Sequence, residues 1–419
     1  MKKLILLAAI AISALSCQQN SEPPATIANP QEKAKQELTT ALDSIVSNGQ
    51  IIGVGVAMVN QDGVLYTRGF GYADKASQAP YTENTIQHIA SVSKTLIGIA
   101  LLKAQEMGKL KLDDPIEKYL PFPVTNPNFP NETISIRHLA LHTSGINDTE
   151  QYMDNAWILK ADQDLSKLST DYPAQRLNPA EKDMPMEDFL KAYLSEGENF
   201  YQADNFIHFK PGERYNYSNI GATLAALVLE KAVGAPFHTF TQTHILTPLG
   251  MTSSGWFLED VDRSKHSKLY RNDYSELPFY GAITYPDGML ISSPQDMGKY
   301  LAELVKGYAG QGTLLSAESY TEYFREQLQD SHFESRNEAH PYDEDYSPAL
   351  FIGHSGQGYV GHSGGDAGVG TWMFFNKEDL TGRFIIINTD WGEDERAKEL
   401  EYYAVWDKME EYFAAMEKK

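Results

Sequence analysis

Apolar positions near the start of the chain change from one period to another. From Ala34 to about Val46 they recur at the spacing of one helix face. Two segments of β-type residues follow, I-G-V-G-V-A-M-V and V-L-Y-T-R-G-F-G-Y, and the turn residues N-Q-D-G separate them. This pattern predicts a helix followed by two antiparallel strands that form a hairpin.

A second hairpin pattern lies near the other end of the chain. Its two segments are G-T-W-M-F-F-N and G-R-F-I-I-I-N-T, with N-K-E-D-L-T-G between them. A long amphipathic stretch then runs from about Asp394 to the C-terminus, which predicts a final helix packed through one face. Strands are therefore expected at both ends of the chain.

Helical patterns and loops marked by Pro and Gly dominate the middle of the chain, roughly residues 80–345. We predict an α/β (α+β) fold: an antiparallel sheet formed from both chain ends and flanked by helices, with an inserted, mostly helical lobe. The sheet lobe would comprise about residues 36–79 and 346–419, and the helical lobe about 80–345. A groove between two lobes is the natural place for a site.

The first residues have the form of a secretory signal. Lys2 and Lys3 precede an apolar run over residues 4–15, which is too short to span a bilayer, and Cys17 follows shortly after it. We predict a signal peptide at 1–17 and an exported protein of the periplasm or cell envelope.

Cys17 is the only cysteine of the chain, which excludes intrachain disulfides and cysteine metal clusters. Its place just after the apolar run resembles a bacterial lipoprotein signal, which implies lipidation of Cys17 and attachment to a membrane. Plain secretion is the alternative, because Ala14 stands where lipoprotein signals usually have leucine. Residues 18–35, rich in Ser, Pro, Asn and Gln, cannot bury a core and predict a flexible tether.

Composition and charge narrow the class of partner. Of the 419 residues, 42% are hydrophobic and 11% aromatic, which is enough for a large packed core or two fused lobes. The net charge of −22 argues against nucleic acid as a partner, because polyanions require basic patches. The simplest explanation of this charge is solubility.

Ser91 and Lys94 lie one helical turn apart in the stretch Q-H-I-A-S-V-S-K-T-L-I-G-I-A. This spacing puts a hydroxyl beside an amine, and the apolar residues behind them would bury the helix that carries both. No other serine of the chain has a lysine three residues later. A serine hydroxyl needs a base within hydrogen-bond reach to act at neutral pH, so the pair is a candidate for an activated nucleophile.

A second candidate motif is Tyr217-Ser218-Asn219, which follows a Pro-Gly turn and precedes a helical run. Tyr270 and Asn272 repeat the pattern Y-x-N without that context. The context therefore favours the Tyr217 copy.

The third candidate motif is His362-Ser363-Gly364-Gly365, at the start of a predicted late strand. Backbone groups can line a groove edge there, and glycine permits the close approach of another group. His354 begins a near-copy, H-S-G. We favour the later copy because G-G-D-A-G-V-G and the hairpin strand follow it.

Together and in this order, S-x-x-K, Y-S-N and H-S-G-G resemble the three active-site motifs of serine penicillin-binding proteins and class C β-lactamases. Residues 112–121, 134–146 and 285–293 are also similar to the family. The resemblance implies a β-lactamase/transpeptidase-like catalytic domain over 36–419 and a serine hydrolase that forms an acyl-enzyme. The segment 149–205 is longer than the family's usual connection, and we expect it to border the groove.

The resemblance also implies roles. Ser91 is the expected nucleophile, and the backbone N–H groups of Ser91 and Gly365 are the expected oxyanion donors. Either Lys94 or Tyr217 takes the serine proton. Both normally titrate at about pH 10, so the base is either a desolvated, neutral amine or a phenolate stabilised by the Lys94 charge. Asn219 would hold a substrate amide.

His362 stands where class C β-lactamases usually have lysine. A fixed cation is thereby replaced by a group that is only partly charged near neutrality, so attraction for a substrate carboxylate should be weaker or pH-dependent. His362, Ser363 and Gly364 are expected to contact the substrate. Family members with histidine here are more like D-peptidases, carboxypeptidases and esterases, and no S-D-N motif or glutamate water activator of class A enzymes is recognisable.

Several alternatives stay open at this point. The resemblance implies a small-molecule or peptide substrate: a D-amino-acid peptide, an ester or a related amide. A true class C-like β-lactamase or D,D-carboxypeptidase is one alternative, and a catalytically silent binding protein of the envelope is another. No cofactor and no metal are predicted, because His138 and His142, four residues apart, have no third ligand and no H-E-x-x-H pattern.

Overall fold

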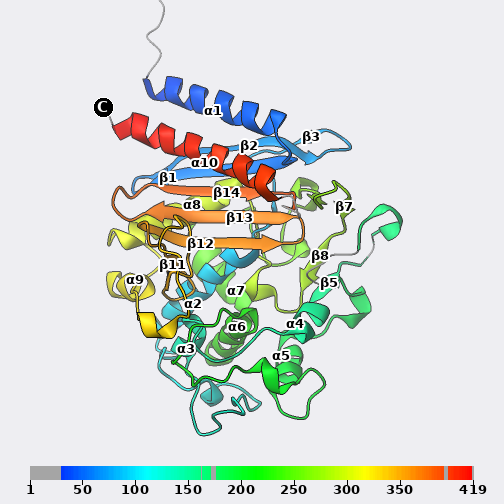
Figure 1. Cartoon of the computed structure of the whole chain (residues 1–419), viewed down its shortest axis with the longest axis vertical. Coiled ribbons are helices and arrows are strands. Elements are labelled where there is room, and N and C mark those ends of the chain that lie inside the picture. Colours follow the sequence, from blue (N-terminus) through cyan, green and yellow to red (C-terminus); the bar gives the residue numbers. More distant parts are fainter. Residues whose placement is uncertain (1–29, 162, 171–175, 391–394, 418–419) are drawn as a thin grey trace, which may run out of the picture.

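The computed structural model describes residues 30–161, 163–170, 176–390 and 395–417 (Figure 1). The predicted signal peptide and Cys17 lie outside the described residues. The first helix, α1 (Pro30–Asn48), has Pro at its first position and Glu32 in its first turn, both of which favour a helix start. Residues 30–35, which we predicted as the end of the tether, are therefore helical.

One antiparallel sheet contains eight strands in the order β10-β11-β12-β13-β14-β1-β2-β3. Strands from the two ends of the chain meet at its centre, where Val54 of β1 pairs with Ile387 of β14. The predicted fold class is thus confirmed. The strands are β1 (Gly53–Asn60), β2 (Gly63–Asp74), β3 (Ala79–Pro80), β10 (Ser347–Pro348), β11 (Gly353–His354), β12 (Tyr359–Asp366), β13 (Val369–Asn376) and β14 (Gly382–Ile387).

Both predicted hairpins are present. The side chain of Asn60 accepts hydrogen bonds from the backbone N–H groups of Asp62 and Gly63, and Gly63 adopts a φ of 137°, so local turn chemistry joins β1 to β2. At the other end, β13 and β14 pair over the register Gly370↔Ile387 to Phe375↔Gly382.

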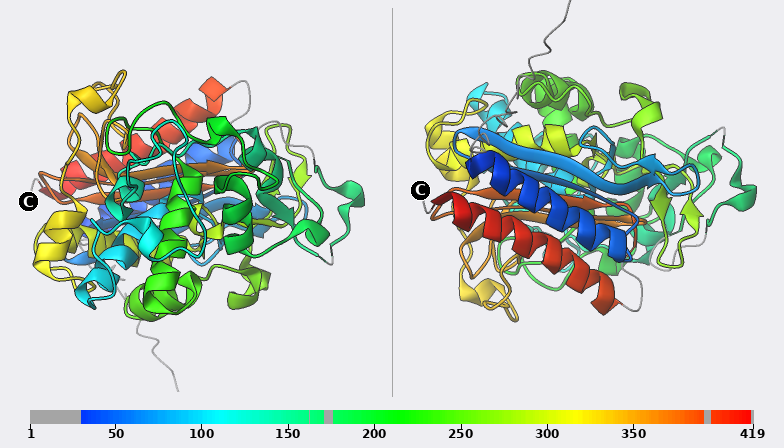
Figure 2. Two further views of the ribbon diagram at one scale, coloured as in Figure 1. Left: turned by 90° about the horizontal axis from the view of Figure 1, so that it is seen from below. Right: turned by 90° about the horizontal axis from the view of Figure 1, so that it is seen from above.

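The two terminal helices cover one face of the sheet. Helix α1 lies beside α10 (Glu395–Glu417), as the view from above shows (Figure 2). Apolar side chains of both helices pack with those of the central strands into one buried cluster, whose members include Leu42, Val56, Ile385 and Trp406. Because this face is closed by helices, the site must lie elsewhere.

The opposite face of the sheet is covered first by α8 (Pro294–Tyr308), which packs on β1, β2 and β14. The side chain of Ser293 caps this helix by accepting a hydrogen bond from the N–H of Asp296. Gly298 permits the close approach, because a Cβ there would lie 3.1 Å from the Cβ of Ala57. The predicted bounds of the helical lobe, about 80–345, include α8, although this helix packs on the sheet. That boundary is therefore wrong for α8.

Most of the remaining helices lie below the sheet in Figure 1, whereas the short strand β7 lies beside it. Helices α2 and α6 lie in contact at its centre and are buried along most of their length. These elements are α2 (Lys94–Glu106), α3 (Ile136–Ala140), α4 (Glu150–Asn155), α5 (Met186–Leu194), α6 (Asn219–Val233), α7 (Phe237–Thr241), α9 (Ala317–Tyr323), β4 (Gln87–His88), β5 (Trp157–Leu159), β6 (Leu269–Tyr270), β7 (Glu276–Leu277), β8 (Tyr280–Ala282) and β9 (Ile291–Ser292).

In the described part of the chain, no single helix combines the length and apolar character of a membrane span. The segments Asn219–Val233 and Phe237–Leu246 meet the criterion only as a pair, bent by 77°. Most of the first segment is buried in the protein core, as expected for a core helix.

Candidate active site

Ser91 and Lys94 lie at the start of helix α2, next to strand β12 of the sheet. Ser91 belongs to a short 3₁₀ turn, Ala90–Ser93, and Lys94 is the first residue of the α-helix that follows. The ammonium nitrogen of Lys94 lies 2.9 Å from the hydroxyl of Ser91 and donates a second hydrogen bond, of 2.7 Å, to the backbone carbonyl of Asp287. The structure therefore joins the two side chains that the spacing predicted.

The second motif reaches the same point from the start of α6. The side chain of Tyr217 lies close enough to Ser91 for the serine hydroxyl to act on the pKa of the phenol. Its ring stacks on the imidazole of His142 at a centroid distance of 4.5 Å, and the ammonium of Lys94 lies 5.1 Å from the ring centroid. The other Y-x-N copy is remote from this chemistry, because the hydroxyl of Tyr270 accepts a hydrogen bond from the backbone of Lys75.

The third motif lies on strand β12, directly against the turn that carries Ser91. A Cβ added to Gly364 would lie 2.7 Å from the backbone nitrogen of Ser91, so only glycine permits this approach. The near-copy is directed elsewhere, since Nε2 of His354 lies 2.7 Å from the carbonyl oxygen of Phe324. The tertiary structure thus brings the later copy, and not the earlier one, to Ser91.

A cavity of about 130 Å³ opens above Ser91. It lies where the two parts of the molecule meet, as expected for a groove between lobes. Its lining consists of Ala90, Ser91, Tyr152, Met153, Trp157, Asn219, Asp287, Gly288, Gly365 and Asp366. Three of these residues come from the long segment 149–205, which therefore borders the groove.

The family model described as Beta-lactamase matches residues 35–405 of this chain. The chain belongs to the β-lactamase family. A penicillin-binding protein of Bacillus subtilis (strain 168) is 29% identical over 223 residues, which make up 53% of this chain and 42% of that protein. Protein flp of Staphylococcus aureus (strain MRSA252) is 26% identical over 64% of this chain and 48% of that protein. The chain thus spans less than half the length of these curated relatives.

Solved structures share the fold of this family member. An octameric penicillin-binding protein homologue from Pyrococcus abyssi has a TM-score of 0.61 at 22% identity and covers 84% of this chain and 73% of its own. A D-amino acid amidase from Ochrobactrum anthropi SV3 has a TM-score of 0.63 at 20% identity. The matched region covers 90% of this chain and 99% of the amidase. The predicted resemblance and fold are confirmed.

Within this family fold, the burial of Lys94 has a direct electrostatic effect. Loss of water lowers the pKa of Lys94 to about 8, and nearby carboxylates, Asp287 first, oppose that lowering. About a tenth of such lysines are neutral at pH 7. Burial acts in the opposite sense on Tyr217, because it raises the pKa of the phenol well above its ordinary value. The site therefore favours a neutral amine over a phenolate.

His362 differs from the expectation of a partly charged imidazole. Burial first, and then the charge of Lys94, lower the pKa of His362 to about 4, so the ring is uncharged near neutrality. Its Nδ1 lies 2.5 Å from the carbonyl oxygen of Ser363. The motif that often carries a cation in this family carries none here.

Glu344 is a site residue that the sequence did not reveal. One of its carboxylate oxygens accepts hydrogen bonds from the backbone N–H and the hydroxyl of Ser363, at 2.8 and 2.7 Å. The hydroxyl of Ser363, which we expected to contact substrate, is thus held by a protein carboxylate. No local pattern around Glu344 indicates this contact, because it joins a loop to a strand 19 residues away.

Asp148 is a second unpredicted residue. Its carboxylate accepts hydrogen bonds from the hydroxyl of Ser218 at 2.8 Å and from the backbone N–H of Asn219 at 2.7 Å. These contacts satisfy donors at the start of α6 and fix the motif that carries Tyr217. The only sequence signal for this role is the position of the aspartate, shortly after the stretch 134–146 that resembles the family.

The two histidines weighed as metal ligands have separate structural contacts. His138 accepts a hydrogen bond from the backbone N–H of Ser135 and helps to cap α3, whereas His142 accepts one from the backbone N–H of Ser218. Among the described residues, no group of three or more His, Cys, Asp or Glu side chains is arranged to hold a metal ion.

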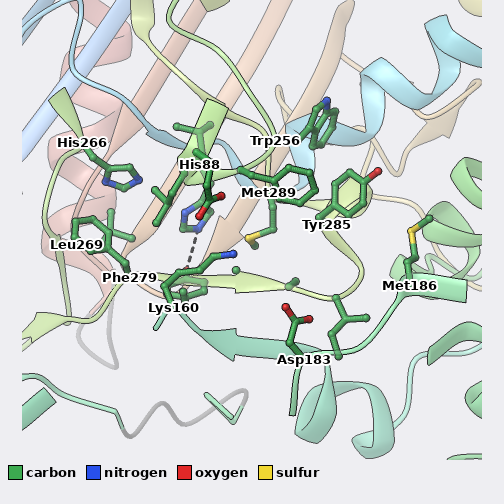
Figure 3. Close-up of a pocket in the computed structure, with 18 of the residues that line it drawn as sticks. His88, Lys160, Asp183, Met186, Trp256, His266, Leu269, Phe279, Tyr285 and Met289 are labelled. Atoms are coloured by element: carbon green, nitrogen blue, oxygen red, sulfur yellow. Dashed lines mark hydrogen bonds between the residues drawn. The ribbon is translucent and has the colours of Figure 1, made fainter. Parts of the chain in front are cut away.

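A larger cavity, of about 410 Å³, is lined in part by residues of strand β8 (Figure 3). His88, Lys160, Asp183, Trp256 and Met289 are among the residues that line it. None of the three motifs contributes to this lining, so we place the chemistry in the smaller cavity over Ser91.

Proposed function

We propose that this protein is a serine hydrolase that forms an acyl-enzyme on Ser91 with an amide or ester substrate. The observation that carries the proposal is the hydrogen bond of 2.9 Å between the buried amine of Lys94 and the Ser91 hydroxyl, at the floor of a cavity. A nucleophile paired with a base of lowered pKa is the arrangement that acyl transfer requires.

In the proposed acylation step, the neutral amine of Lys94 accepts the proton of Ser91 while the serine oxygen bonds to the substrate carbonyl carbon. The carbonyl oxygen becomes an oxyanion, for which the backbone N–H groups of Ser91 and Gly365 are the proposed donors. During the attack Tyr217 stays protonated, because its pKa is raised. Its hydroxyl then passes a proton to the leaving group and regains one from Lys94.

In the proposed deacylation step, water takes the place of the leaving group. A water molecule attacks the acyl carbon and loses its proton to the same Tyr217–Lys94 pair, and the Ser91 oxygen leaves with a proton. Asn219, which lines the cavity, is proposed to hold the substrate amide. His362 and Gly364 shape the groove edge, and no positive charge from His362 takes part.

Intact mass spectrometry after exposure to a fluorophosphonate probe tests this proposal. We expect one stoichiometric adduct, lost in Ser91→Ala and kept in the control Ser355→Ala, whose serine belongs to the near-copy of the third motif. Absence of an adduct in the folded wild-type protein would support the silent binding protein instead.

Turnover assays separate the substrate alternatives. A β-lactamase would hydrolyse nitrocefin, and a D,D-carboxypeptidase would release D-Ala from a peptide that ends in D-Ala-D-Ala. We expect both activities to be weak relative to hydrolysis of substrates without a carboxylate, because His362 is uncharged and a carboxylate needs a cation at this position.

We also propose that the protein is exported and held at a membrane through a lipid on Cys17. The basic start, the apolar run and the position of the cysteine support this proposal. Fractionation of cells that express the full chain is the test. We expect the protein in the membrane fraction and Cys17→Ser in the soluble envelope fraction, whereas equal distribution would indicate plain secretion.

A further inference from the structure

We propose that the substrate carries a free ammonium group on the carbon next to its reactive carbonyl, and that the carboxylate of Asp366 binds this ammonium. The inference rests on the proposed function, in which Ser91 attacks that carbonyl. It adds the substrate class, compact α-aminoacyl amides and esters, and the side chain that selects it.

Asp366 is placed in the groove by the geometry of strand β12. Side chains two residues apart point to the same face of a strand, so Asp366 lies on the same face as Gly364. That face is the one pressed against Ser91, as the 2.7 Å approach at Gly364 shows. The step between the two residues is roughly 7 Å along the strand, a span that an α-carbon, its ammonium and one hydrogen bond cover. Asp366 and Ser91 also line the same cavity.

The carboxylate of Asp366 is held in a defined orientation. The indole N–H of Trp157 donates to Oδ2 at 3.4 Å, and the backbone N–H of Ala367 donates to Oδ1 at 2.8 Å. Nε2 of His88 lies 3.5 Å from Oδ2. With its side chain only 6% exposed, the carboxylate is preorganised for a ligand, which lowers the entropy cost of binding.

His88, which lies beside Asp366, also lines the larger cavity (Figure 3). The hydroxyl of Tyr280 donates its proton to the carbonyl of Ala367 at 2.7 Å, so Nε2 of His88, which lies 2.9 Å from that hydroxyl, carries a proton and acts as donor. The same nitrogen lies 3.5 Å from Oδ2 of Asp366. The orientation of the carboxylate is thus supported from behind, through β8.

Apart from the amine of Lys94 beside Ser91, the charged groups around the cavity are carboxylates, which attract a cation more than an anion. Of the described residues that line it, two are carboxylic acids, Asp287 and Asp366, and none is lysine or arginine. The carboxylates of Asp148 and Glu344 lie close enough to act on Lys94. An added carboxylate on the substrate would meet this field at short range, whereas an ammonium would be stabilised by it.

The size of the cavity restricts the acyl group. A cavity of about 130 Å³ is smaller than the usual ligand site of roughly 300–1,000 Å³. Tyr152 and Trp157 are the aromatic residues of its lining. A short aminoacyl group fits such a space, while the leaving group extends toward solvent.

A matched set of alanine p-nitroanilides, in both enantiomers, tests the inference. One member has a free amine, one is N-acetylated and one is N-succinylated. For the wild-type protein we expect kcat/KM to be at least about tenfold higher for the free amine than for the acetylated member, and lowest for the succinylated one. A preference for the acetylated or succinylated member would overturn the inference.

The variant Asp366→Asn tests the anchor itself. We expect kcat/KM for the free amine to fall by about tenfold, while that for the acetylated substrate changes by less than about twofold. The control Asp183→Asn removes a carboxylate from the larger cavity and should leave the preference unchanged. Equal losses on both substrates in Asp366→Asn would overturn the assignment.

A second measurement covers the case in which Asp366→Asn does not fold. Free-amine and acetylated amides are compared for their ability to protect wild-type Ser91 from the fluorophosphonate probe. Protection by the free amine alone supports the inference, and equal or reversed protection contradicts it. Failure of the proposed function has a different signature, because the probe then labels no serine at all.

Discussion

Lys94 donates a hydrogen bond of 2.7 Å to the backbone carbonyl of Asp287, and the buried carboxyl group of the same aspartate raises the pKa of the lysine. The backbone contact positions the amine beside Ser91, while the side-chain charge acts on its protonation. Hydrogen bonds from Tyr152 and Thr223 hold that carboxyl group in place. The two effects can be separated, because Asp287→Asn keeps the carbonyl and removes the charge.

We therefore predict that Asp287→Asn shifts the pH dependence of Ser91 acylation to lower pH. Acylation needs neutral Lys94, so its rate rises as pH increases through the pKa of Lys94, at about 8. Without the carboxylate that pKa falls further, and the midpoint moves down. Rates of fluorophosphonate labelling between about pH 6 and pH 10 measure it. Asp62→Asn, in the exposed β1–β2 turn, is the control, and an unchanged or raised midpoint contradicts the prediction.

Removal of the proposed base should abolish most of the reactivity of Ser91. We expect Lys94→Gln to lower the rate of fluorophosphonate labelling by about 100-fold or more, because general-base assistance is lost. Lys103→Gln is the control. Lys103 lies on the same helix, and its ammonium donates a hydrogen bond to the carbonyl of Leu314, so we expect the rate to change by less than about twofold. Retained labelling in folded Lys94→Gln would indicate that Tyr217 is the base.

Two neighbouring glycines of β12 should respond differently to substitution by alanine. A Cβ at Gly364 would lie 2.7 Å from the nitrogen of Ser91 and 3.0 Å from the Cβ of Ala90, whereas a Cβ at Gly365 meets no atom within 4 Å. We expect Gly364→Ala to lower the free energy of unfolding by about 1–3 kcal/mol. Gly365→Ala should change it by less than about 0.5 kcal/mol. Chemical denaturation measures both, and equal losses would contradict this geometry.

The buried, uncharged state of His362 predicts a stability loss in acid. Its pKa is lowered from 6.5 to about 4 in the folded protein. Between these values the unfolded chain binds the proton and the folded chain does not, so stability falls as pH is lowered through this window. We expect the melting temperature of His362→Gln to depend less on pH across the window than that of the wild type. The exposed His208→Gln should follow the wild type, and parallel curves for all three proteins would contradict the prediction.

Local sequence signals were sufficient for the elements that form through short-range contacts. The turn at Asn60–Gly63 depends on hydrogen bonds between residues two and three positions apart. The pairing of Ser91 with Lys94 depends on the pitch of one helical turn. Such features are encoded within a few residues. The sequence therefore predicted correctly that a turn joins the two strands and that the side chains of Ser91 and Lys94 lie together.

Contacts between distant segments could not be predicted in this way. Helix α8 shows a helical pattern, yet nothing in that pattern states which lobe it packs on. The copy H-S-G-G at His362 and the copy at His354 look alike in sequence, and only the order of strands in the sheet brings Gly364 to Ser91. Glu344 and Asp148 became site residues through hydrogen bonds across loops that no periodicity specifies.

The sequence by itself determined the hairpins, the terminal helices, the three motifs and their order, and with them the family. Periodicity and turn chemistry act over a few residues, which is why these features can be read without the fold. The tertiary structure alone decided the charge of each site group. Burial lowers the pKa values of Lys94 and His362, and it gathers carboxylates from four separate segments around one amine. The reason is that desolvation and Coulomb interactions depend on distances in space, which the chain sets only when it is folded.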